Sequence, residues 1–244
     1  MNGGMQTLDG ITPNKRLSAG GGGGPTVPSD IPGLLLWFKT PISGATGNNP
    51  IASWPDDSGN GRNVTPQGGV GLIYKTSVIN GLATVECSGG GNYGAFTTTS
   101  LGTSHTVFIV IRPVAGFSDG VFLGGSALGR YTPYTDTTDI YYRALSTEAF
   151  VTVANGGLSN DTPYLFEIVR SGVSVSFYKN ASQLSTTQTL AVNTALSVEE
   201  LFGIAGGQLN PIAQIAELFV YDSALSASDR QAMEVYISDR FAFF

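Results

Sequence analysis

Four tyrosines stand close together in a polar stretch of the chain, and they are the side chains best suited to bind a ligand. The stretch covers residues 129–144 and reads GRYTPYTDTTDIYYRA. A tyrosine ring offers a flat apolar face together with a hydroxyl, a combination that suits sugar rings and protein interfaces. We therefore predict a binding loop, with the alternative that the last two tyrosines lie on a strand, one ring inside and one outside. The candidate ligand-binding residues are Tyr131, Tyr134, Tyr141 and Tyr142.

Carboxylates for cleavage of a glycosidic bond do not form a recognisable pair. Such hydrolysis needs two carboxyl groups that flank the bond. Glu199 and Glu200 are adjacent, so on a strand they would face opposite ways, and Glu217 stands alone. His105 is the one histidine, and no serine or cysteine motif of a catalytic triad accompanies it. We predict no catalytic residue and no enzymatic activity.

Aspartates in turns raise the question of a calcium site. Calcium prefers carboxylate and carbonyl oxygens, which loops supply. Asp57 lies in the run DDSGNG, where an aspartate side chain commonly bonds to the nearby backbone and forms a turn. We predict no metal and no cofactor, and we keep calcium as the alternative at four loop aspartates. These are Asp56, Asp57, Asp136 and Asp139.

Most of the chain consists of short apolar or alternating segments separated by glycine-rich turns, the pattern of a β-sandwich. The clearest strands are residues 34–39, residues 104–112, and the hairpin of residues 164–170 with 173–179. Strands do not alternate with helices, which excludes a parallel α/β sheet. We predict an all-β, antiparallel two-sheet jelly-roll sandwich of roughly a dozen strands.

One short helix is predicted near the C-terminus, over residues 226–240. Ser226 can accept backbone N–H bonds at its start, and Asp229 favours the positive end of the helix. Met233, Ile237 and Phe241 recur on one face, which must be buried. We expect this helix to pack against an end or an edge of the sandwich.

Three blocks of sequence carry a family signature. The first is IAELFVY at residues 215–221, followed by DSALS at 222–226. The others are LLLWF at 34–38 with WPDDSGNG at 54–61, and INGLATV at 79–85. Together they resemble laminin-G-like, concanavalin A-like lectin and glucanase domains over roughly residues 33–243. The resemblance implies a lectin-like sandwich, a fold that carries lectins, hydrolases and adhesion modules. Similar domains occur in bacteriophage structural proteins.

Composition argues against several kinds of partner. The formal net charge is −6 and 12% of residues are charged, without the basic clusters of nucleic-acid-binding proteins. No apolar run approaches the ~20 residues of a membrane span, and the N-terminus lacks the apolar core of a secretory signal. Cys87 is the single cysteine, which suits folding in a reducing cytoplasm. We predict no nucleic-acid partner and no membrane partner.

The N-terminal residues differ from the rest, and we assign residues 1–28 to an extended arm and residues 29–244 to the sandwich domain. The arm contains five consecutive glycines at residues 20–24. Such a tract has nothing to bury, and ordering it costs about 1–2 kcal/mol per residue. We expect a partner surface to offset this, from other virion proteins or from copies of the same chain. The expected apolar anchors are Met5, Leu8, Ile11 and Leu17.

These features favour a non-catalytic structural or adhesion protein of a virus particle, as a decoration, fibre or tail component of a tailed bacteriophage. The arm would attach a homo-oligomer to the particle, and the lectin-like domain would face outward toward a cell-surface glycan. The expected localisation is the virion, after synthesis in the host cytoplasm. A free bacterial carbohydrate-binding module is the alternative, and a glycoside hydrolase is the third hypothesis, disfavoured by the missing carboxylate pair.

Overall fold

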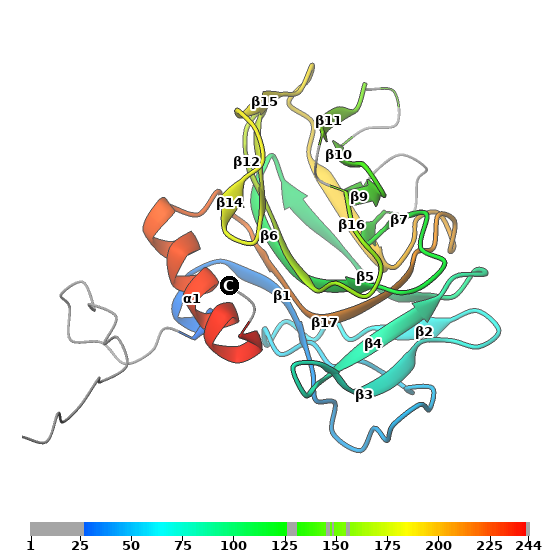
Figure 1. Ribbon diagram of the computed structural model, residues 1–244. Coiled ribbons are helices and arrows are strands. Elements are labelled where there is room, and N and C mark those ends of the chain that lie inside the picture. The colour runs from blue at the N-terminus through cyan, green and yellow to red at the C-terminus, as the bar shows by residue number, and fades with distance from the viewer. Residues whose placement is uncertain (1–26, 126–130, 145–146, 148, 155–156, 243–244) are drawn as a thin grey trace, which may run out of the picture.

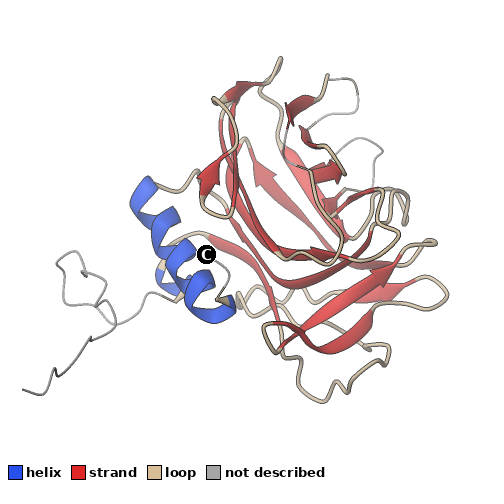
Figure 2. Ribbon diagram, in the orientation of Figure 1, coloured by secondary structure: helices blue, strands red, loops and turns tan. Residues whose placement is uncertain are grey.

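The computed structural model describes residues 27–125, 131–144, 147, 149–154 and 157–242. Two antiparallel sheets form a sandwich, and a C-terminal helix covers the outside of one of them (Figures 1 and 2). The predicted all-β, two-sheet class with one C-terminal helix is therefore confirmed. The expected anchors of the arm, Met5, Leu8, Ile11 and Leu17, lie outside the described residues.

Sheet I has nine strands, and its order is β14-β13-β12-β6-β17-β4-β3, with β1 also paired to β17 and β15 to β13. Its centre is made by two strands of ten residues, Ser104–Pro113 and Ile212–Tyr221, which are both rich in β-branched and aromatic residues. The strands are β1 (Leu34–Lys39), β3 (Ile73–Ile79), β4 (Leu82–Ser88), β6 (Ser104–Pro113), β12 (Tyr164–Ser171), β13 (Ser174–Lys179), β14 (Ser182–Gln183), β15 (Gln188–Thr189) and β17 (Ile212–Tyr221).

Sheet II has eight strands, and its order is β11-β10-β9-β8-β16-β5-β2, with β7 also paired to β9. Several of its strands are only two or three residues long, too short for a hydrophobic period, which is why the sequence predicts fewer strands than the structure contains. The strands are β2 (Thr65–Gln67), β5 (Tyr93–Gly102), β7 (Asp119–Val121), β8 (Leu123–Gly124), β9 (Tyr131–Asp136), β10 (Asp139–Arg143), β11 (Val151–Ala154) and β16 (Leu196–Leu201).

The main core lies between the two sheets. Phe38 is packed between Trp54 and Phe96, with ring centroids 5.9 and 5.7 Å away. The strands of the two sheets differ in how they are buried: β6 and β17 are buried almost continuously, whereas β10 and β11 alternate between buried and more exposed residues. Continuous burial requires cover on both faces of a strand, and alternation indicates one face open to solvent.

Helix α1 (Ala227–Phe241) supplies the cover for sheet I. Ser226 caps it, because its Oγ accepts the Asp229 backbone N–H at 3.2 Å. Met233, Ile237 and Phe241 are fully buried against the outer face of β6, β12 and β17. The predicted helix and its buried residues are confirmed, but its place is corrected: it lies on a sheet face, where Phe108 and Phe219 provide an apolar surface, and not at an end or edge.

The described chain begins on this same side of the sandwich. A short 3-10 helix, η1 (Pro28–Asp30), follows Val27, and the Tyr221 hydroxyl donates to the Pro28 carbonyl at 2.9 Å. Ile31 is 5% exposed and belongs to the cluster beneath α1. Contacts with the sandwich are therefore in place from Pro28 onward. Among the described residues, no helix is long and apolar enough to cross a bilayer.

Candidate functional site

The tyrosine-rich stretch is an ordered hairpin on sheet II, and the prediction of a loop is wrong. β9 and β10 pair with Tyr141 opposite Tyr134 and Ile140 opposite Thr135. Ile140 is buried in the core, whereas Tyr141 is half-buried on the outer face. The alternative derived from the sequence, a strand with one ring inside and one outside, is correct. Polar residues, and Pro133 on β9, obscured the alternation of buried and more exposed residues that β10 shows.

Two of the four predicted tyrosines form the centre of an aromatic surface. The rings of Tyr134 and Tyr141 lie 5.0 Å apart at 48°. Phe150, which is 45% exposed, meets Tyr141 edge-on with ring centroids 5.8 Å apart. We call Tyr134, Tyr141 and Phe150 the aromatic face. It lies on the outer side of sheet II, the sheet that the helix does not cover (Figure 1).

Phe150 was not identified as a binding residue from the sequence. It precedes an alternating strand, and a large apolar residue in that position is usually part of a core. The register of the sheet places it instead: Thr152, two residues later, is exposed and lies opposite Tyr141, a pairing that the sequence does not specify. Residues two apart on a strand share a face.

Tyr142 does not belong to the aromatic face. Its side chain is fully buried between the sheets. Its hydroxyl accepts a hydrogen bond from Arg170 Nη1 at 2.8 Å and lies 3.3 Å from His105 Nε2. The proposal that Tyr142 contacts a ligand is therefore corrected, because the inward position on β10 places it in the core. The side chain of Tyr131 lies outside the described residues.

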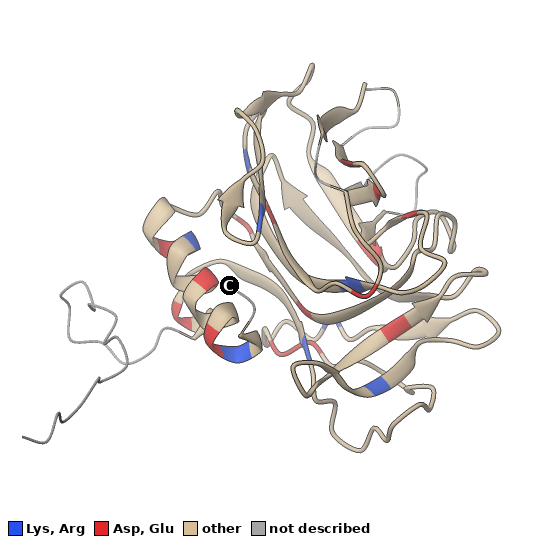
Figure 3. Cartoon of the chain, viewed as in Figure 1, with Lys and Arg blue, Asp and Glu red and all other residues tan. Residues whose placement is uncertain are grey.

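Carboxylates hold the two phenols of the aromatic face. Tyr134 donates its hydroxyl proton to Asp119 Oδ2 at 3.0 Å, and Tyr141 donates to Asp136 Oδ2 at 2.8 Å. Hydrogen bonding to Asp136 raises the pKa of Tyr141 to about 12. Burial, and then the bond to Asp119, raise the pKa of Tyr134 above its usual value. Both rings therefore remain neutral donors with fixed orientations. Figure 3 shows acidic residues on β7, β9 and β10, the strands that carry these contacts.

The aspartates considered for calcium have other partners. Asp56 accepts backbone N–H bonds from Trp37, Ser58 and Arg62 at 3.0 to 3.1 Å, so its carboxylate builds the turn. Asp57 forms an ion pair with Lys39 at 3.7 Å.

Asp136 accepts the backbone N–H bonds of Thr138 and Asp139, both at 2.7 Å. Partial burial raises its pKa, but these bonds outweigh it and the net pKa is lowered. Within the described ranges, no three His, Cys, Asp or Glu residues are grouped to hold a metal ion.

The buried nucleophile and base candidates are isolated from the surface. Burial, and then the Arg170 charge, lower the pKa of His105 to about 3. Its Nδ1 lies 3.2 Å from the Leu101 carbonyl, which can only accept, so Nδ1 carries the proton. Burial raises the pKa of the Cys87 thiol to about 12. Neither side chain can meet a substrate in this arrangement, since both are fully buried.

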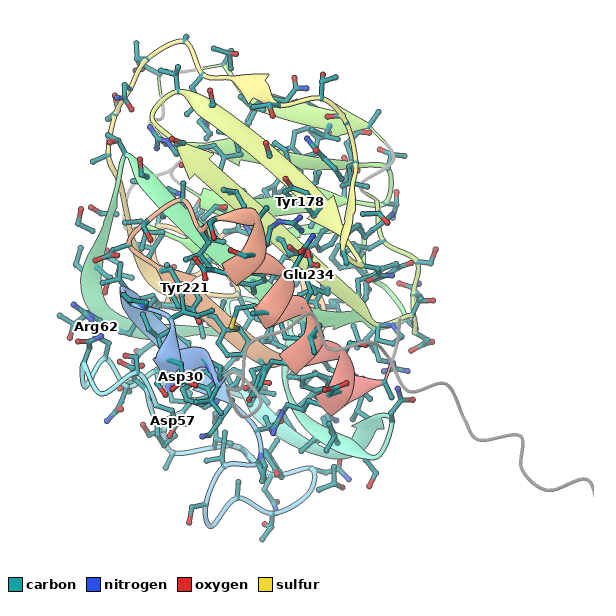
Figure 4. All side chains as sticks on the ribbon, turned by 90° about the vertical axis from the view of Figure 1, so that its left-hand side faces the viewer. Asp30, Asp57, Arg62, Tyr178, Tyr221 and Glu234 are labelled. Carbon is teal, nitrogen blue, oxygen red and sulfur yellow. The ribbon has the colours of Figure 1, made fainter. Side chains whose placement is uncertain are left out.

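Two glutamates with raised pKa values lie beneath α1 and hold the helix in place. Burial, and then Glu234, raise the pKa of Glu167, whose Oε2 lies 3.2 Å from Arg230 Nη1. Figure 4 looks onto this side, with Tyr178 and Glu234 at the helix. Burial also raises the pKa of Glu217 although Arg240 opposes it with an ion pair at 3.0 Å.

The surroundings of these two glutamates are structural. The Trp37 indole donates to Glu217 Oε1 at 2.8 Å, and the Arg230 guanidinium lies over the Tyr178 ring at 4.0 Å. These perturbed carboxyl groups are covered by the helix, whereas catalytic ones lie in an open cleft.

A concavity lies in the loop between β1 and β2. Its volume is about 400 Å³. It carries neither an aromatic ring nor a charged group, so we regard the aromatic face as the stronger candidate. The lining residues are Ile42, Ser43, Gly44, Ala45, Thr46, Asn49, Pro50, Ile51, Ala52, Ser53 and Pro55.

Comparison by sequence gives no relatives: no protein-family model matches the chain, and no curated protein matches it. Comparison by structure finds many solved proteins with a similar fold. Domain 4 of AbnA, an extracellular arabinanase from Geobacillus stearothermophilus solved in complex with arabinotriose, matches with a TM-score of 0.58 and 15% identity. The match covers 83% of this chain and 98% of that domain.

Two larger proteins contain a similar unit. Botulinum neurotoxin type C, whose cell entry is described as dependent on two ganglioside molecules, matches with a TM-score of 0.55 and 11% identity over 84% of this chain. Trypanosoma rangeli sialidase matches with a TM-score of 0.55 and 11% identity over 87% of this chain. The chain spans 51% of the toxin structure and 34% of the sialidase structure.

The fold is a concanavalin A-like β-sandwich. Identity of 11 to 15% shows the fold alone, and the same fold carries different activities in different proteins. The fold expected from the sequence blocks is therefore confirmed, whereas the function has to be argued from the aromatic face itself.

Proposed function

We propose that this chain is a non-catalytic carbohydrate-binding domain whose aromatic face binds a sugar. The observation that carries the proposal is an aromatic surface on the sheet face that α1 does not cover, where Phe150 is 45% exposed and Tyr134 and Tyr141 are half-buried. The apolar faces of sugar rings pack on aromatic side chains, and nearby polar groups fix their orientation. Asp119 and Asp136 supply such polar groups at the edge of the rings.

The structural neighbours support the proposal at the level of the fold. An arabinanase domain in complex with arabinotriose and a toxin dependent on gangliosides both contain a sandwich of this kind. The match to the arabinanase domain covers nearly all of that domain, so a unit of this size exists as a separate module beside a catalytic one. This favours a binding module over a complete enzyme.

Glycan-array binding of the purified chain tests the proposal. We expect the wild-type chain to bind at least one glycan, and the Tyr134→Ala, Tyr141→Ala double variant to lose affinity by at least tenfold, since each stacked ring contributes on the order of 1 kcal/mol. Tyr178→Ala is the matched control, because that half-buried tyrosine lies on the outer side of sheet I. Unchanged binding in the double variant, or equal loss in the control, would place the site elsewhere.

Absence of catalysis is part of the proposal. Glu199 and Glu200 have separate environments, since Glu200 accepts the Gly206 N–H at 2.7 Å whereas Glu199 bonds to Thr98. A glycosidase requires two carboxyl groups that flank one bond. Release of reducing ends from a bound oligosaccharide would contradict this part and leave the binding site untouched.

A place on a virus particle, with the arm as the attachment and a homo-oligomer as the assembly, stays a prediction from the sequence resemblance. Mass spectrometry of purified particles against the cell-envelope fraction tests it. Enrichment in particles supports the virion, and enrichment in the envelope fraction supports the free bacterial carbohydrate-binding module.

A further inference from the structure

Three carboxylates surround the aromatic face, and within the described part of the chain none is in an ion pair. Asp119 and Asp136 bond to the two phenols, and Asp139 Oδ2 lies 3.4 Å from the Tyr141 hydroxyl. Ion pairs among the described residues use cations on other parts of the molecule. They are Lys39 with Asp57, Lys75 with Glu86, Arg112 with Asp161, Arg230 with Glu167 and Glu234, and Arg240 with Glu217.

Two of these acids oppose one another directly. Asp119 on β7 is the register partner of Asp136 on β9. Like charges at opposed positions of an antiparallel pair are destabilising. Asp136 is held in the β9–β10 turn by the backbone N–H groups of Thr138 and Asp139, whereas Asp119 accepts hydroxyl bonds from Ser118 and Tyr134. The opposed pair concentrates negative charge on this face, where a cationic group of a ligand would relieve the repulsion.

The carboxylates are spread around the rings and do not converge on one point, in agreement with the lack of a metal-binding group among the described residues. The rings themselves attract cations. The Arg143 guanidinium lies over the Phe150 ring at 4.3 Å from its centroid, so one ring of this surface already holds a cation. A positive group above an aromatic face gains about 0.5–1 kcal/mol at an exposed site, and more when desolvated.

We propose that the ligand of the aromatic face carries a protonated amine, and that it is an amino sugar with a free amino group. This inference rests on the proposed function. A sugar ring packs on Tyr134 and Tyr141, and its ammonium group lies toward Asp119, Asp136 and Asp139. Anionic sugars are rejected, because three carboxylates face them with Arg143 as the one described cation of the aromatic face.

The experiment compares four oligosaccharides of equal length on the full chain: a β-1,4-linked glucosamine oligomer, its N-acetylated form, a neutral glucose oligomer and an anionic galacturonate oligomer. We expect the free-amine oligomer to bind at least tenfold more tightly than its acetylated form, with the difference shrinking in high salt. The galacturonate oligomer should be the weakest ligand. Oligolysine serves as the probe for a charge-only interaction.

Asp119→Asn and Asp139→Asn remove charge and keep an oxygen that can accept a hydrogen bond. The double variant should bind the amine and acetylated forms within about threefold of one another, since it loses two of the three carboxylates and exposed ionic contacts are individually weak. Asp239→Asn is the control, an exposed acid of equal charge on α1. Thermal unfolding of each variant shows whether the domain remains folded.

The outcomes separate the two proposals. Equal binding of the amine and acetylated forms overturns the amine preference and leaves carbohydrate binding intact. Tighter binding of the galacturonate oligomer than of the free-amine oligomer has the same two consequences. Oligolysine binding that matches the sugar overturns the amino-sugar assignment in favour of a basic peptide. Failure to bind any oligosaccharide here and on the array overturns carbohydrate binding itself.

Discussion

His105, Tyr142 and Arg170 form a chain of buried polar side chains at one end of the core. Arg170 is fully buried, and its guanidinium donates to Tyr142 and to the carbonyls of Gly172 and Thr194 at 2.7 to 2.8 Å. Neutral oxygens thus satisfy a buried cation, and the same cation disfavours protonation of His105. A buried polar chain of this kind fixes the position of Tyr142 and therefore of strand β10.

Acid should weaken the fold through His105. Its pKa is about 3 in the folded protein, against 6.5 for a solvent-exposed histidine, so the unfolded state binds the extra proton first as pH falls. The contribution of His105 to the free energy of unfolding is thus fully present above pH 6.5, and it is lost progressively as the pH falls from there toward about 3. Between pH 7 and pH 5 the free energy of unfolding of the wild type should fall by about 2 kcal/mol relative to His105→Gln.

Urea unfolding at several pH values measures this difference. Comparison with the variant cancels the titration of carboxyl groups, including the opposing effect of Glu167, because His105 is the only histidine. A difference that does not change with pH would show that His105 is accessible to protons in the folded state.

Helix α1 is an element whose docking can be tested by one substitution. Ile237 lies on the inner face of the helix and is fully buried, whereas Val235 lies on the same helix and is 49% exposed. Ile237→Asp should lower the free energy of unfolding by about 3–5 kcal/mol, because an unpaired charge would enter an apolar cluster. Val235→Asp should change it by less than about 1 kcal/mol. Chemical denaturation measures both, and equal stability of the two variants would contradict the docking of α1.

Elements with strong local signals were predictable from the sequence. Strand β1 was predicted with the bounds that it has, and α1 was predicted to within one residue at each end. Their signals are a dense apolar run in one case, and a cap with an apolar stripe in the other. The β9–β10 hairpin was missed because its outer face consists of tyrosines and aspartates, which are also the residues of loops.

The candidate site was predictable only in part. Tyr134 and Tyr141 were found from residue type, but their pairing across two strands requires a register that the sequence does not specify. Asp119 and Phe150 come from other strands or loops, and tertiary structure alone brings them to the tyrosines. Tyr142 failed as a candidate for the same reason, since one residue of displacement along a strand reverses the face.

At the scale of the whole molecule, the predicted boundary between arm and sandwich has a measurable consequence. Removal of residues 1–24 should change the melting temperature by less than about 2 °C, because described contacts with the sandwich are in place from Pro28. Removal through Ile31 should lower it by several degrees, since it deletes a buried apolar side chain and the partner of the Tyr221 hydroxyl. Differential scanning calorimetry compares the two truncations, and a large loss in the shorter one would show that the arm stabilises the sandwich.

Both ends of the described chain lie on the helix-covered side of the sandwich. Val27 leads into η1 beside α1, and Ala242 caps the C-terminal end of α1, where the Asn80 side chain donates to its carbonyl at 3.3 Å. The aromatic face lies on the other sheet, so a copy tethered by either end presents its rings away from the tether (Figure 1). Several copies on one support would then engage a polymeric ligand together, and avidity could exceed single-site affinity by about 10²–10⁴ without any new contact.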